Sequence, residues 1–153
     1  DTAARALPTT AAMAGEPSRD PIWPDAPRYG ADTPWPPYAF RPGHDPHPVD
    51  HPEGHSHGLR HEPTVRPPEA WRANADYLRA VDLYHRGYFW EAHELWEGLW
   101  RAEAAGTPAR SLYKGLIHLA AAELKRAVRN ERGFATHVRR AHASLSAAPA
   151  RYM

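Results

Sequence analysis

Proline use divides this chain into two unlike halves and limits what each half can form. Fifteen of the 17 prolines lie in residues 1–70. Proline lacks a backbone N–H and fixes its φ angle, so it is excluded from helix interiors and from central strands. We therefore expect regular helices only from residue 68 onward. The 153 residues are enough for one domain with a modest core.

Charge follows the same division. Residues 1–70 carry 6 Lys and Arg against 10 Asp and Glu, whereas residues 71–153 carry 13 against 8. Cysteine is absent, which excludes disulfides and thiolate metal sites. No apolar run approaches the roughly 20 residues that a membrane helix needs, and residues 1–20 show no secretory pattern. We expect a soluble, cytoplasmic protein with no membrane partner.

The proline-rich half contains two kinds of segment. Residues 1–20 are small and polar without an apolar period, which predicts disorder. Residues 21–67, called the arm from here on, hold five aromatic residues that need something to pack on. We expect the arm to lie extended along the helical body. The aromatic residues are Trp23, Tyr29, Trp35, Tyr38 and Phe40.

Residues 68–147 show the period of an all-α bundle of about four mostly antiparallel helices. The first helix is expected from Pro68 to about His85, the second over 88–105 and the third over 109–129. A turn at 130–133 precedes the fourth, whose buried side should hold Phe134, Val138, Ala141 and Leu145. Gly87 is expected at a positive φ after the first helix. Thr107 and Pro108 should begin the third helix, and Gly115 should allow a close helix contact.

The second helix carries an unusual mixture of side chains on one stripe. Residues three and four apart share a helix face, so this stripe consists of Trp90, His93, Glu94, Glu97 and Trp100. An ordinary surface helix separates charged from aromatic residues. We expect His93, Glu94 and Glu97 to be mostly buried, with at least two of them hydrogen-bonded to groups outside their own helix.

Two blocks resemble the family named domain of unknown function 309. Phe89, Glu91, Ala92, His93, Glu94, Glu97 and Trp100 follow Gly87 in the pattern of its first block. Gly115-Leu116-Ile117-His118-Leu119-Ala120 matches its second block, with His118 where the family pattern has glutamine. The resemblance covers about residues 74–147 and implies an all-helical bundle. The family's name assigns no activity, so the chemistry depends on the residues themselves.

The stripe allows three interpretations. His93 and Glu97, four apart, or Glu94 and Glu97, three apart, could direct two ligands at one divalent transition metal ion. His118 or Glu123 on the third helix could then add a ligand. Alternatively, the stripe is a hydrogen-bonded polar cluster that fixes helix packing. Acid–base catalysis is the third interpretation, although Ser111, Ser144 and Ser146 lack the context of an activated nucleophile, so whether the protein is an enzyme stays open.

The arm contains six histidines within residues 44–61: His44, His47, His51, His55, His57 and His61. Their spacing matches no zinc-finger pattern, and a surface chain with incidental metal affinity is one interpretation. The sharper one is that His47 and His55 fold back beside His93 and Glu97 into a composite site. The candidate metal ligands are thus His93, Glu94, Glu97, His118, His47 and His55.

Six basic residues lie near the turn between the third and fourth helices: Lys125, Arg126, Arg129, Arg132, Arg139 and Arg140. They lack the base-stacking aromatic residues typical of nucleic-acid binding, and we interpret them as a solvated face that pairs with the acidic arm. The leading functional hypothesis is a small domain that binds a metal or a small ligand. The alternative is a protein-interaction module, including association between copies of this chain.

Overall fold

The computed structural model describes residues 21–148, so the expectation of disorder for residues 1–20 falls outside it. Four helices follow one another: α1 (Ala75–His85), α2 (Phe89–Ala102), α3 (Pro108–Ala127) and α4 (Glu131–Ala147). A short 3-10 helix, η2 (Pro68–Ala73), precedes them. Residues 21–148 contain no strand, and the predicted all-α class is confirmed. No helix in this part of the chain is long and apolar enough to span a bilayer.

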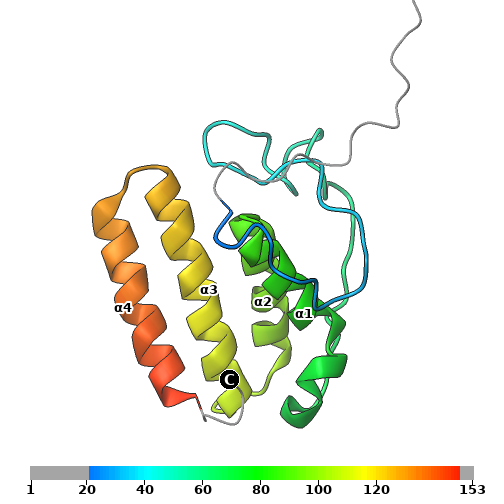
Figure 1. Ribbon diagram of the computed structural model, residues 1–153, viewed down its shortest axis with the longest axis vertical. Helices are drawn as coiled ribbons and strands as arrows, with labels where there is room; N and C mark the ends of the chain where they lie inside the picture. The colour runs from blue at the N-terminus through cyan, green and yellow to red at the C-terminus, as the bar shows by residue number, and fades with distance from the viewer. Residues whose placement is uncertain (1–20, 149–153) are drawn as a thin grey trace, which may run out of the picture.

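Each helix packs mainly on the next one in sequence. Figure 1 shows α3 and α4 side by side and antiparallel, with α1 and α2 on the other side of α3. Gly115 lies at a close contact between α3 and α4, because a Cβ atom at this position would stand 2.6 Å from Leu145 Cδ2. The predicted role of Gly115 in a close helix contact is therefore confirmed.

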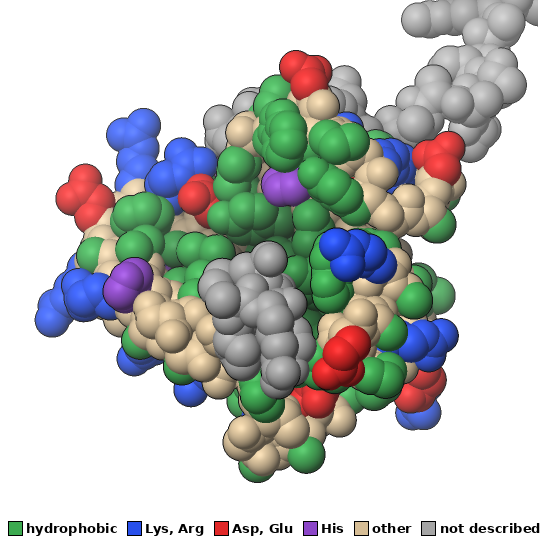
Figure 2. All heavy atoms as spheres, turned by 60° about the horizontal axis from the view of Figure 1, so that its bottom comes forward, with side chains coloured by type: hydrophobic (Ala, Val, Ile, Leu, Met, Phe, Trp, Pro, Cys, Tyr) green, Lys and Arg blue, Asp and Glu red, His purple; other side chains and the backbone are tan. Residues whose placement is uncertain are grey.

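The hydrophobic core lies between α1, α2 and α3. Trp96, Tyr88 and Leu83 are at most 2% exposed, and small residues such as Ala80 and Ala92 let the helices approach. Seen from the lower end of Figure 1, hydrophobic side chains gather in the middle and charged side chains project around the edge (Figure 2). The helix that carries the stripe, α2, is thus one of the three helices that form the core.

The first helix differs from the continuous one expected over residues 68–85. Ala70 leaves helical φ/ψ values within η2, and Asn74 is extended. The Asn74 side chain accepts a hydrogen bond from the backbone N–H of Tyr77 at 3.0 Å, which caps a new helix. The prediction of one continuous helix was wrong because Asn74 is extended and serves as the N-cap of a separate helix.

The helix boundaries predicted from turn and cap residues agree better with the structure. Gly87 has a φ of 85°, and α3 begins at Pro108 with Thr107 as its N-cap. α4 begins earlier than expected, because the Asn130 side chain accepts from the backbone N–H of Gly133 and caps the helix there. Val138 is 39% exposed rather than buried, since α4 stands at the end of the row and packs mainly on α3.

The arm contains neither helix nor strand and crosses α1 and α2, as the blue and cyan trace in Figure 1 shows. Three buried carboxylates of the helices accept backbone N–H groups from it. Asp82 accepts from Tyr29 and Gly30 at 2.8 and 3.0 Å. Asp76 accepts from Thr64 at 2.5 Å, and Glu91 accepts from Phe40 at 2.9 Å.

Arg79 of α1 and Arg86, the C-cap of this helix, hold the arm through its carbonyl groups and one indole ring. Arg79 donates to the carbonyl oxygens of Thr33 and Pro34. The guanidinium groups of Arg28, Arg79 and Arg86 lie 4.2, 5.0 and 5.6 Å from the ring of Trp35. Cations this close to an indole face are attracted by its quadrupole. The contacts between arm and helices thus involve backbone groups, histidines and aromatic rings.

Within residues 21–148, no ion pair is recorded between the arm and the basic residues near the turn between α3 and α4, contrary to expectation. Arg126 binds Glu123 of its own helix. Among the described residues, the ion pairs between arm and helices are His55 with Glu91 and His61 with Asp76. In both ion pairs the acidic group belongs to the helices and the histidine to the arm, which is the reverse of the expected arrangement.

Candidate metal centre and arm cavity

His93 on α2 lies between two carboxylates of the same helix. Its Nδ1 is 3.4 Å from Glu94 Oε1, and its Nε2 is 3.3 Å from Glu97 Oε2. One ligand atom from each of the three residues falls within 4.8 Å of the others, a grouping that could hold a metal ion. The helix itself favours this cluster, because Glu97 lies four residues after His93 and three after Glu94 and therefore shares a face with each.

His93 and Glu97 are mostly buried as expected and Glu94 is less so, but within residues 21–148 no hydrogen bond from the three to a group outside α2 is recorded. The side chains of His93 and Glu97 are each 23% exposed, and that of Glu94 is 41% exposed. The contacts recorded for them come from α2, where Arg101 also pairs with Glu97. The five residues of the stripe are all partly buried, whereas Phe89, Ala92, Trp96 and Leu99 are fully buried in the core.

His118 on α3 meets a histidine that the sequence analysis did not select. Its Nδ1 lies 3.0 Å from the Nδ1 of His137 on α4, with ring centroids 5.3 Å apart. A signal for His137 was present in the sequence. It lies three residues after Phe134 and four before Ala141, on the face of α4 that turns toward α3.

Electrostatics connects this pair to His93. Burial lowers the pKa of both His118 and His137, and a positive charge on His93 would lower the pKa of each further. Arg140 acts on both in the same direction. The pair therefore favours the neutral imidazole form, in which a ring nitrogen carries a lone pair for a proton or a metal.

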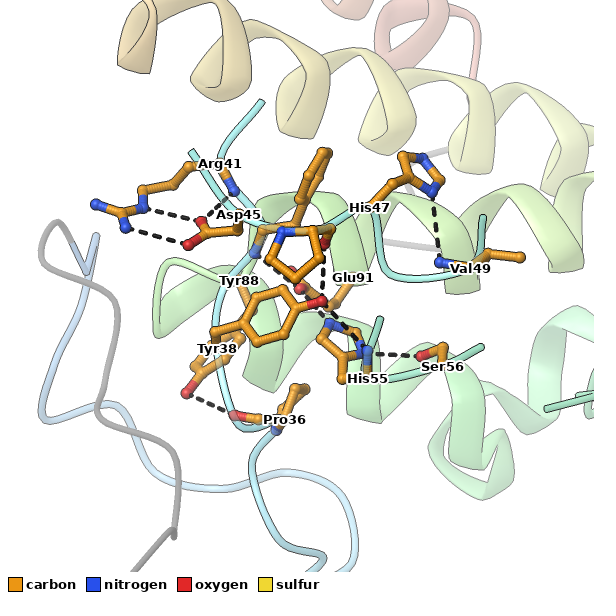
Figure 3. A network of polar contacts seen from close by, with 12 residues as sticks. Pro36, Tyr38, Arg41, Asp45, His47, Val49, His55, Ser56, Tyr88 and Glu91 are labelled. Atoms are coloured by element: carbon orange, nitrogen blue, oxygen red, sulfur yellow. Dashed lines mark hydrogen bonds and ion pairs between the residues drawn. The ribbon is translucent and has the colours of Figure 1, made fainter. Parts of the chain in front are cut away.

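The arm histidines do not join this cluster. His55 Nε2 is 2.8 Å from Glu91 Oε1, and both side chains are 5% exposed (Figure 3). The His47 ring packs edge-on against Phe40 and Trp90, with centroids 5.2 and 5.3 Å away. Across residues 21–148, the grouping around His93 contains neither histidine, so the expected composite site is not formed.

A cavity of about 620 Å³ lies between the arm and the first two α-helices. Two histidine–carboxylate pairs line it, His55 with Glu91 and His61 with Asp76. Prolines and leucines supply much of the remaining wall, and Glu94 lines it as well. A volume of 300–1,000 Å³ is typical of small-molecule sites. Sequence reasoning missed this cavity because arm and helices meet there from distant parts of the chain.

Glu91 forms the buried polar cluster that the stripe was expected to form. It is 5% exposed, and its Oε1 receives both the Phe40 N–H and His55 Nε2, while no partner is recorded for Oε2. The hydroxyl of Tyr38 accepts from the backbone N–H of His55 and donates to the Pro46 carbonyl (Figure 3). A buried polar cluster therefore exists, but it is formed by Glu91, two residues before His93, and not by the predicted residues.

Comparison with known proteins finds a family match over part of the helical domain. The model of the family Domain of unknown function (DUF309) matches residues 77–137, which confirms the resemblance seen in the two sequence blocks. The matched range includes Glu91, His93, Glu97, His118 and His137 and excludes the arm. No curated protein and no solved structure matches the chain.

Proposed function

We propose that the helical domain binds one divalent transition metal ion, with His93 and Glu97 of α2 as its first ligands. The observation that supports this most directly is the position of the His93 imidazole between the carboxylates of Glu94 and Glu97, with one ligand atom from each within 4.8 Å of the others. Imidazole and carboxylate together suit zinc, iron and manganese.

The pair His118 and His137 is the best source of further imidazole ligands. Two nitrogens bound to a tetrahedral zinc ion at 2.0–2.1 Å stand roughly 3.3 Å apart, close to the 3.0 Å between these two Nδ1 atoms. The pair stands outside the 4.8 Å grouping around His93, so a shared ion requires a rotamer change of His93 or His118. Glu97 would exchange its contact with Arg101 for the ion.

The experiment compares purified wild-type protein with His93→Ala and with His142→Ala, which removes an exposed histidine of α4. Elemental analysis should find about one ion per wild-type chain and none in His93→Ala. Chelator should lower the melting temperature of the wild type and of His142→Ala, because metal binding adds to folding free energy.

One outcome would reject the metal hypothesis. If chelator leaves the wild-type melting temperature unchanged while His93→Ala still lowers it, His93 has a structural role only. A second readout separates the ligands. Co²⁺ bound to the wild type should show visible absorption of a tetrahedral site, and this spectrum should change in His118→Asn and in His137→Asn.

The structure gives less support to the interaction module. An exposed patch of tryptophans on α2 would have favoured it. Trp96 of α2 is 1% exposed. Among the described residues, the tryptophan with a largely exposed side chain is Trp23, which belongs to the arm and not to α2. Association between copies of this chain stays a prediction, which sedimentation of the metal-loaded and chelated protein would test.

A further inference from the structure

Ser56 completes a hydrogen-bonded series with the buried pair in the arm cavity. Its Oγ lies 2.8 Å from His55 Nδ1, and His55 Nε2 lies 2.8 Å from Glu91 Oε1 (Figure 3). Ser56, His55 and Glu91 all line the cavity of about 620 Å³. The metal cluster of α2 contributes none of these three groups.

The partners of His55 fix the direction of its hydrogen bonds. A carboxylate accepts hydrogen bonds, so the tautomer with the proton on Nε2 is the one that satisfies Glu91. Nδ1 then holds a lone pair, and the Ser56 hydroxyl donates to it. This is the arrangement in which an imidazole acts as a general base toward a hydroxyl while a carboxylate holds its tautomer.

The surroundings keep the base in place. The His55 side chain is 5% exposed, and its ring packs against Tyr38 at 4.7 Å between centroids. The Phe40 N–H fixes the same carboxylate oxygen that His55 uses. Such orientation by packing and secondary hydrogen bonds is what a general base requires.

We infer that Ser56 is a nucleophile activated by His55 and Glu91, and that the cavity accepts small carboxylic esters with a short apolar acyl chain. Pro34, Pro36 and Leu59 give the cavity its apolar wall. Arg60 also lines it and supplies a positive charge for the oxyanion that forms during acyl transfer.

The reaction balances without a further reagent. Ser56 Oγ forms a bond to the acyl carbon, its proton passes to His55 Nδ1, and the same proton passes to the alcohol as the ester bond breaks. Water then attacks the acyl-serine and loses a proton to Nδ1. Return of that proton to Ser56 Oγ releases the carboxylic acid and restores the hydroxyl.

The test uses a fluorophosphonate probe and p-nitrophenyl butyrate, both in the presence of chelator so that a metal-bound hydroxide cannot contribute. We expect one adduct per wild-type chain, located at Ser56 by peptide mass, and a release of p-nitrophenol that depends on Ser56. Ser56→Ala should lose both signals with an unchanged melting temperature. His55→Gln should slow labelling by at least about 100-fold, within the usual range for loss of a general base.

Two matched variants separate this role from a structural one. His44→Asn changes an exposed arm histidine that does not line the cavity, and should leave the labelling rate within about 3-fold. Ser56→Cys should react with iodoacetamide at a rate that falls when His55→Gln is added. Absence of labelling in the wild type, equal labelling of Ser56→Ala, or an unchanged rate in His55→Gln would overturn the inference.

Discussion

Trp35 of the arm stacks on Tyr88, the residue that precedes α2, with ring planes 12° apart and centroids 5.8 Å apart. Tyr88 is 0% exposed, so this stack covers the core itself. Trp35→Ala should destabilise the protein by about 2 kcal/mol, since it removes a large contact and the site of three nearby guanidinium groups.

Denaturant unfolding would measure this change, and limited proteolysis would report on the arm. Trp23→Ala is the control, because Trp23 is 47% exposed and should cost much less. If both variants lose equal stability, the stack on Tyr88 does not hold the arm.

Asp82→Asn should loosen the start of the arm. The Asp82 carboxylate is 2% exposed and accepts the N–H groups of both Tyr29 and Gly30. The asparagine NH2 group would replace one of the two accepting oxygens and would face a backbone N–H that needs an acceptor. The expected loss in the free energy of unfolding is about 2 kcal/mol. Hydrogen exchange at Tyr29 and Gly30 should accelerate. Asp32→Asn, at a side chain that is 95% exposed, should leave that exchange unchanged.

Gly115→Ala should push α3 and α4 apart. The added methyl would meet Leu145 Cδ2 and Cγ at 2.6 Å, and overpacking of this kind costs about 1–3 kcal/mol. Much of the obstacle is a side-chain tip, so Leu145→Ala in the same chain should recover part of the loss. A double-mutant cycle would measure the coupling, and strict additivity would show that the two residues do not compete for space.

Acid should weaken the contact between the arm and α1. Burial lowers the pKa of His85, Arg86 lowers it further, and Asp82 opposes both. Because the folded pKa is depressed, His85 favours the folded state at neutral pH, and this contribution is lost as the pH falls from about 7 toward 5. His85 packs against Trp23 at 5.3 Å, so Trp23 fluorescence should follow the change. His85→Asn should flatten this pH dependence.

The helices could be predicted because their apolar residues repeat at helical spacing over long stretches. α3 shows this best, with Pro108 at its start and Leu112 and Ala120 buried. The break at Asn74 could not be found in this way, since an asparagine serves equally as a cap and as a polar surface residue. Cap geometry depends on the backbone on both sides.

The candidate site was predicted only in part. The cluster of His93, Glu94 and Glu97 follows from helix geometry alone, so the sequence contained it. The contact of His118 with His137 depends on how α4 is rotated against α3, and the contact of His55 with Glu91 joins residues 36 positions apart. Nothing in the spacing of the arm histidines specifies which one reaches which carboxylate.

The three carboxylates that hold the arm have a consequence for how the arm can vary. Asp76, Asp82 and Glu91 recognise the main chain at Thr64, Tyr29, Gly30 and Phe40, so these attachments do not depend on side-chain identity. At Tyr29, Phe40 and Thr64 most substitutions should leave the attachment intact. Proline is the exception, since it has no N–H to give. Although the arm is rich in proline, we expect proline to be excluded from these positions, because their N–H groups bind the helices.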